Sequence, residues 1–152
     1  MKQGRLVIAA LGDEEYGLPI EHVREIIRLG QIRSVPDAPE YLQGLIDVRG
    51  QAIPLINLHT RFKTHTRFGK LDPKDEGLEE SAYGLIIEYQ DNLVALSVDE
   101  VREVREVDVI EECPEMIQVP YIGGIVNLPN RIIMKLDLPL MLKDSGVEAI
   151  IS

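Results

Sequence analysis

The sequence predicts an all-β protein of two small five-stranded antiparallel β-barrels, which arise from an internal repeat and carry short helices. The stretch at residues 44–58 (G-L-I-D-V-R-G-Q-A-I-P-L-I-N-L) recurs at residues 124–138 (G-I-V-N-L-P-N-R-I-I-M-K-L-D-L), and an internal repeat decides the architecture. Short aliphatic and β-branched runs separated by turn residues fill both halves, as in small barrels. No helical pattern of a dozen residues separates them, which disfavours a parallel α/β sheet.

The composition indicates an aliphatic core and an acidic surface. Hydrophobic residues make up 45% of the 152 residues, but aromatic residues only 5%, with no Trp. Acidic residues outnumber basic ones by 26 to 16, which gives a net charge of −10. Nucleic acids and anionic membranes both attract positive charge. The balance therefore argues against either as the main partner and fits a basic or apolar partner surface.

The chain has a single cysteine, Cys113, so an internal disulfide framework is excluded. The N-terminal stretch lacks the apolar core of a signal peptide and carries acidic residues directly afterwards. No apolar run approaches the roughly 20 residues of a membrane-spanning helix. We expect a cytoplasmic protein with no direct membrane insertion.

The first half begins with a predicted hairpin. Residues 5–11 and 16–20 read as strands, with a turn at residues 12–14 between them. Pro19 predicts a strand edge or a bend. Residues 23–28 read as the next strand.

A second repeated passage defines the predicted domain organisation. Residues 18–26 (L-P-I-E-H-V-R-E-I) recur at residues 96–104 (L-S-V-D-E-V-R-E-V), at an offset of 78 residues that grows to 80 at the later repeat. The second copy therefore has two extra residues in its loops. We expect subdomain one at about residues 5–62, a polar linker at about 63–81 and subdomain two at about 82–143.

Short helices are predicted beside the repeated strands. Residues 36–44 resemble a one-turn helix with Asp37 as N-cap and Gly44 at its end. Asn57 and Asp137, which align in the two copies, are predicted N-caps of short helices that follow the repeated strands.

No catalytic, cofactor or metal site is predicted. The histidines His22, His59 and His65 lack a metal-ligand spacing, and Cys113 has no nearby partner. No glycine-rich phosphate loop is present, and paired acids such as Glu111 and Glu112 read as solvated surface. A small hydrolytic or sugar-active β-barrel enzyme would need a pocket with a perturbed carboxylate or a nucleophile. The pattern favours a binding or scaffold protein.

Arg49 is the strongest candidate for a partner contact. It lies at the predicted tip of the hairpin in the first copy, where the second copy has Pro129. A charge that one copy lacks is not needed to build the barrel. The V-R-E of residues 23–25 is kept at residues 101–103, which fits a structural role at least as well as a functional one.

Three motifs recur in one recognisable order: V-x-E-I at residues 23–26, V-P-x-x-P at 35–39 and G-x-I-x-x-R-G-x-x-I-P-L-I-N-L-x-x-R-F at 44–62. Together they resemble the CheW-like domain family of chemotaxis coupling proteins. It extends over about residues 5–143. Family members usually have N-L-R-G at the hairpin where this chain has D-V-R-G, so Asp47 is a departure that alters charge and local hydrogen bonding.

The resemblance implies one CheW-like domain over residues 1–152, with two barrels of Src-homology-3-like topology, no catalysis and no cofactor. It implies an adaptor that joins methyl-accepting chemoreceptors to the histidine kinase CheA in membrane-associated arrays. An adaptor of the same fold in another receptor–kinase array, such as one for twitching motility, remains an alternative. The kinase-binding residues are unassigned. The implied receptor-contact residues are an aliphatic groove and three further positions: Val7, Ile20, Val23, Val101, Glu25, Gly44 and Arg49.

Overall fold

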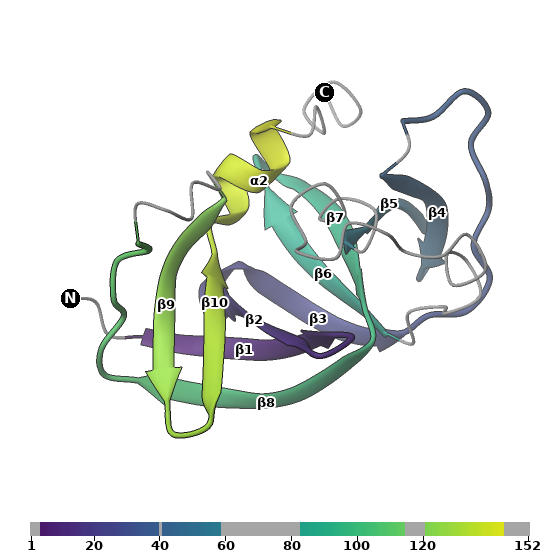
Figure 1. Ribbon diagram of the computed structural model, residues 1–152. Coiled ribbons are helices and arrows are strands. Elements are labelled where there is room, and N and C mark those ends of the chain that lie inside the picture. The colour runs from purple at the N-terminus through teal and green to yellow at the C-terminus, as the bar shows by residue number, and fades with distance from the viewer. Residues whose placement is uncertain (1–3, 40, 59–82, 115–120, 145–152) are drawn as a thin grey trace. The chain divides into compact units, whose positions relative to one another are not determined.

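The computed structural model describes residues 4–39, 41–58, 83–114 and 121–144, with the side chains of residues 143 and 144 left out (Figure 1). Strands dominate it, which confirms the predicted fold class. The elements are β1 (Gly4–Leu11), β2 (Glu14–Pro19), the 3-10 helix η1 (Ile20–His22), β3 (Val23–Arg28), β4 (Leu42–Val48), β5 (Gln51–Asn57), β6 (Tyr83–Tyr89), β7 (Asn92–Val98), β8 (Glu100–Val107), β9 (Ile122–Leu128), β10 (Arg131–Leu136) and α2 (Leu138–Asp144).

The chain divides into two compact units, each built on one five-stranded sheet. Unit 1 comprises Met1–Val23 and Val101–Ser152, and unit 2 comprises Arg24–Glu100. The strand order is β8-β1-β2-β10-β9 in the sheet of unit 1 and β3-β6-β7-β5-β4 in the sheet of unit 2. These orders are equivalent once the two copies of the repeat are aligned.

The strand registers confirm the repeat. Ile46 faces Ile53 across β4 and β5, and Val126 faces Ile133 across β9 and β10, each 80 residues further on. The isolated bridges that precede these hairpins correspond as well, and they are Arg33–Leu45 and Glu111–Ile125.

The division of the chain into halves was predicted wrongly. The first hairpin, β1–β2, does not join the sheet of β4 and β5 but that of β8, β9 and β10, while β6–β7 joins β3, β4 and β5. The connections explain the exchange. β2 runs into β3 through the three residues of η1, and only Asp99 separates β7 from β8. Neither connection is a hairpin loop, which would place β3 beside β2 or β8 beside β7 in one sheet. The chain therefore continues into the other sheet.

The prediction of wholly antiparallel barrels also needs correction. β10 pairs parallel with β2, and β5 pairs parallel with β7. Parallel neighbours require a long connection rather than a tight turn. The exchange of hairpins supplies it, because each parallel pair joins strands from different halves of the sequence.

Both units have the aliphatic core that the composition predicts. The residues of each buried cluster alternate along their strands, following the two-residue period of β-structure. The buried cluster of unit 1 is Leu6, Ile8, Val107, Val126 and Ile133. The cluster of unit 2 is Ile46, Ile53, Leu55, Ile86 and Ala95.

The structure confirms only part of what was predicted for the helix caps and loops. Asp137 caps α2, because its Oδ1 accepts a hydrogen bond from the backbone N–H of Leu140 at 3.1 Å. The predicted one-turn helix at residues 36–44 is wrong: Asp37 lies in a turn with φ of 58°, and Gly44 lies within β4. Of the helix predicted after Asn57, only Leu58 lies within the described residues, and it is helical.

Candidate functional site

An exposed ion pair joins β3 to the β4–β5 hairpin. Nη1 of Arg49 donates to Oε2 of Glu25 at 2.8 Å, and Nη2 donates to Oε1 at 2.5 Å. The guanidinium therefore binds the carboxylate through two parallel hydrogen bonds, the arrangement that suits its planar fork. These bonds hold the pKa of Glu25 below its usual range and raise the pKa of Arg49.

The hairpin turn positions Arg49 by an unusual backbone conformation. Both central residues have positive φ, 51° at Arg49 and 84° at Gly50, as in a type I′ turn. An arginine in the left-handed region is disfavoured. The second copy avoids this conformation, because Pro129 fixes its own φ near −65° and only Asn130 is left-handed, at 63°. The strained turn is thus specific to the copy that carries Arg49.

Asp47 closes the same turn. Its Oδ1 accepts a hydrogen bond from the backbone N–H of Gly50 at 2.9 Å. An asparagine would offer the same acceptor, so the Asp at this position preserves the turn and adds a charge at the base of the hairpin.

Gly44 is required by close backbone contact. Its φ is 155°, and a Cβ added there would collide with the carbonyl oxygen of Arg33 and lie 2.8 Å from Cγ2 of Ile32. The backbone pair between Arg33 and Leu45 holds this segment against β4, with N···O distances of 2.9 and 2.8 Å. Gly124 meets Glu111 in the same way in the second copy, so the structure gives Gly44 an architectural role.

The predicted aliphatic residues differ in exposure. Val7 is only 1% exposed and offers no surface to a partner in this structure. Ile20, Val23 and Val101 are half-buried. These four residues belong to unit 1, whereas Glu25, Gly44 and Arg49 belong to unit 2. Of the predicted set, the structure brings Glu25 and Arg49 into direct contact.

The second copy has its own glutamate–arginine pair, which sequence reasoning missed. Glu103, the counterpart of Glu25, accepts a hydrogen bond from Nη2 of Arg131 at 2.8 Å. Arg131 is two residues beyond the position equivalent to Arg49, at the start of β10 rather than in the turn. The glutamates of both V-R-E motifs therefore pair with an arginine of the following hairpin. This correspondence indicates that both pairs have a structural role.

Arg131 also holds a buried carboxylate. Glu15 is 7% exposed and binds Nε and Nη2 of Arg131 at 2.9 and 3.0 Å, together with Nη1 of Arg102 at 2.9 Å. The hydrogen bonds from Arg131 are the main cause that lowers the pKa of Glu15, against the opposing effect of burial. The repeat alignment could have revealed this site, because Glu15 stands where unit 2 has Leu93.

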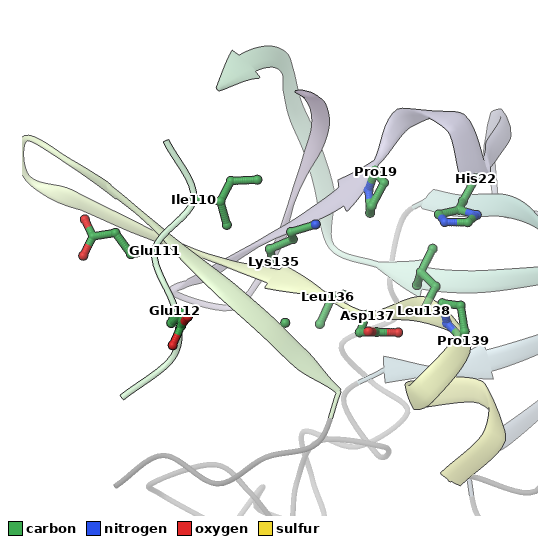
Figure 2. Close-up of a pocket in the computed structure, with 11 residues that line it drawn as sticks. Pro19, His22, Ile110, Glu111, Glu112, Lys135, Leu136, Asp137, Leu138 and Pro139 are labelled. Carbon is green, nitrogen blue, oxygen red and sulfur yellow. The ribbon is translucent and has the colours of Figure 1, made fainter. Parts of the chain in front are cut away.

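A cavity of about 420 Å³ opens in unit 1 beside the end of β10 (Figure 2). Residues from the end of β2, the segment after β8, strand β10 and the start of α2 line it. Its walls are apolar on several sides, and Lys135 extends among them (Figure 2). The lining residues are Pro19, His22, Ile110, Glu111, Glu112, Gly123, Lys135, Leu136, Asp137, Leu138 and Pro139.

The side chains described above can recognise a partner through ion pairs and hydrogen bonds. Within the described ranges, no group of three or more His, Cys, Asp or Glu side chains is arranged to hold a metal ion. Cys113 is half-buried. No helix among the described residues is long and apolar enough to cross a membrane.

The family follows from the sequence profile of the CheW-like domain, which matches residues 5–146. The chain belongs to the CheW-like domain family. This match covers both sheets, including the hairpin β1–β2 and helix α2, so the exchanged arrangement of strands lies within one CheW-like domain.

Relatives of this CheW-like domain cover nearly its whole length. The chemotaxis protein CheW of Treponema pallidum is 34% identical over 145 residues, which span 90% of this chain and 81% of that protein. The chemotaxis protein CheW of Bacillus subtilis is 28% identical over 152 residues, spanning 96% of this chain and 92% of that protein. The crystal structure of the scaffolding protein TtCheW from Thermoanaerobacter tengcongensis superposes with a TM-score of 0.79 at 28% identity, covering 100% of this chain and 96% of that one.

Proposed function

We propose that this CheW-like domain is a non-catalytic adaptor that couples methyl-accepting chemoreceptors to the histidine kinase CheA. The observation that carries the proposal is the family match over residues 5–146, together with relatives that match over most of their length and are named as chemotaxis and scaffolding proteins. The adaptor acts in the cytoplasm, in association with membrane receptor arrays. It links its partners by binding and needs no reaction centre.

The exposed arginine of the β4–β5 hairpin is the polar receptor contact in this proposal. The side chain of Arg49 is 73% exposed although it is paired with Glu25, so donors of its guanidinium remain open to a carboxylate or a backbone carbonyl. Half-buried Ile20, Val23 and Val101 supply apolar contact area of the kind that receives the apolar face of a helix. Val7, which is 1% exposed, contributes to the core rather than touching the partner.

Co-sedimentation with a receptor cytoplasmic fragment and CheA tests the function. The wild-type protein should sediment with both partners together, and failure to bind both would overturn the proposal. The variant Arg49→Asn removes the guanidinium but keeps a residue that tolerates positive φ, so it should weaken receptor binding without lowering the melting temperature. Arg5→Gln removes an exposed arginine of β1 and serves as the matched control with unchanged binding.

A further inference from the structure

The outer face of the β9–β10 hairpin carries apolar side chains that the core does not use. Ile133 belongs to the core cluster of unit 1. Its neighbours Ile132 and Met134 therefore point to the other side of the sheet, because successive side chains of a strand alternate. Ile132 is 59% exposed, more than any other large hydrophobic residue in the described part of the chain. Met134 and its partner across the hairpin, Ile125, are half-buried on the same outer side.

The segment after β8 widens this outer face. Glu111 exchanges two backbone hydrogen bonds with Ile125, at 2.8 and 2.9 Å, so the segment runs beside β9. Ile110 packs against the core cluster, and Figure 2 shows it and Glu111 on opposite sides of the segment. Alternation then places Val109, which is 45% exposed, on the outer side with Glu111. The antiparallel register brings Val109 beside the residue of β9 that pairs with Ile132. We call Val109, Ile125, Ile132 and Met134 the apolar patch.

Acidic residues border the apolar patch on both sides. Ile133 pairs with Glu15 across β10 and β2, so the residue before Glu15 lies beside Ile132. On the opposite side, the residues around Val109 are acidic. All of these acids are exposed, and none makes a side-chain hydrogen bond or ion pair within the described ranges. The acidic border consists of Glu14, Glu106, Asp108, Glu111 and Glu112.

Neighbouring cations do not offset this acidic border. Arg131, next to Ile132, is already bound to Glu15 and Glu103, and Arg105 is bound to Glu103. Lys135 extends into the cavity (Figure 2) and can offset at most one of the five carboxylates. The patch therefore lies in negative charge, which adds to the net charge of −10 of the whole chain.

The repeat shows that the acidic border is not needed to build the barrel. Residues 106–112 (E-V-D-V-I-E-E) correspond to residues 28–34 (R-L-G-Q-I-R-S), and the bridges Glu111–Ile125 and Arg33–Leu45 confirm this alignment. The segment has four acids and no base in unit 1, but two arginines and no acid in unit 2. Exposed Ala52 takes the place of Ile132. The same backbone thus accepts the opposite charge and a smaller side chain.

We propose that the apolar patch binds a segment of a protein partner in which aliphatic side chains are flanked by lysines or arginines. The aliphatic side chains contact Val109 and Ile132, and the basic ones pair with the acidic border. Charge complementarity selects this occupant, because acidic segments, nucleic acids and anionic membranes are repelled here. A second copy of the chain is disfavoured by its own net charge of −10. The proposal rests on the adaptor function only in that the occupant is a protein.

A titration followed by NMR tests the occupant with defined peptides. Acetyl-Lys-Leu-Lys-Leu-Lys-amide, acetyl-Glu-Leu-Glu-Leu-Glu-amide and acetyl-Lys-Ser-Lys-Ser-Lys-amide are each added to the isotopically labelled protein. The first should shift the amide signals of Val109, Glu111 and Ile132. The acidic peptide and the serine peptide should each bind about tenfold more weakly, the one through repulsion and the other through loss of apolar contact. Equal affinity for the basic and acidic leucine peptides, or shifts confined to other residues, would overturn the proposal.

Reversal of charge in the acidic border separates recognition from folding. The double variant Glu106→Arg with Glu111→Arg introduces the arginines that unit 2 has at the equivalent positions. It should prefer the acidic leucine peptide, and its melting temperature should not fall. The matched control is Glu21→Arg, which reverses an exposed charge in η1, at the opposite end of β2 from Glu14. The control should keep the preference for the basic peptide, and a folded double variant that also keeps it would contradict the proposal.

The apolar contact is tested by Ile132→Ala, which copies Ala52. It should weaken binding of the basic leucine peptide several-fold and leave binding of the serine peptide unchanged, whereas unchanged affinity for both would exclude the patch. This variant decides the question even if the double variant does not fold. In sedimentation velocity, a dimer of the wild type that Ile132→Ala abolishes would assign the patch to a second copy and overturn the proposal.

These measurements need neither chemoreceptor nor kinase. A failure of the wild-type protein to sediment with those partners would therefore refute the proposed function without deciding the peptide result.

Discussion

Replacement of Gly44 by alanine should destabilise unit 2 strongly. The added Cβ collides with the carbonyl oxygen of Arg33 and lies 2.8 Å from Cγ2 of Ile32. The φ of 155° adds backbone strain of about 1–3 kcal/mol for any residue with a Cβ. The same carbonyl accepts the N–H of Leu45 at 2.8 Å, so relief of the collision weakens that bond too. We expect a loss of about 3 kcal/mol, equivalent to a fall in melting temperature of about 6–12 °C.

Thermal unfolding followed by circular dichroism measures this effect, and two further glycines calibrate it. Gly30→Ala is the matched control, because a Cβ there meets nothing within 4 Å. Gly124→Ala should have an intermediate effect, since its Cβ would lie 2.6 Å from Cγ2 of Ile110 and 3.0 Å from the carbonyl oxygen of Glu111 without the strained φ. A Gly44→Ala protein with the melting temperature of the wild type would refute the architectural role. Contact with a partner would then be the remaining reason for a glycine at this position.

Three other substitutions test the charge network, the hairpin and the aliphatic set. Glu15→Gln should lower the free energy of unfolding by about 1–2 kcal/mol at pH 7, because it removes the charge of the buried carboxylate that binds both Arg131 and Arg102, whereas exposed Glu14→Gln should not. Since the pKa of Glu15 is lowered in the fold, its contribution is present above the unfolded-state pKa and disappears as the pH falls through the folded one; a constant difference in acid denaturation would contradict this. Arg49→Asn should leave the melting temperature unchanged or higher while weakening receptor binding, and a collapse of the melt would show a structural role instead. Val7→Ala should cost about 2 kcal/mol in urea unfolding, and Val23→Ala, at a half-buried site, clearly less; equal losses would contradict the difference in burial.

The hydrophobic pattern and the repeat were sufficient to predict most strands. The hairpins β1–β2 and β4–β5 follow from short aliphatic runs separated by turn residues, which is local information. The caps were predictable in part, as Asp137 shows. Gly44 was predicted at a helix end but lies in a strand, because its conformation depends on the distant carbonyl of Arg33. A pattern of residue types does not contain that contact.

The candidate site was less predictable than the fold. Arg49 was identified because one copy of the repeat has it and the other does not. The same comparison contains a signal for Glu15 against Leu93. It becomes informative only when the strand registers show that these two positions have equivalent neighbours, Ala10 and Glu88. The burial of Val7 could not be predicted, since nothing in its sequence context distinguishes a buried valine from an accessible one.

Residue patterns along the chain were sufficient to predict most strands, the aliphatic composition of the core, the repeat and the family. Local propensity and residue alternation carry these features, so each is visible without tertiary contacts. Three features became visible only in the folded chain: the exchange of hairpins between the two sheets, the parallel pairing of β2 with β10, and the link that Arg131 makes between Glu15 and Glu103. The physical reason is that strand pairing and ion pairing depend on which distant segments meet, and the two copies of a repeat offer nearly equivalent partners until the whole chain folds.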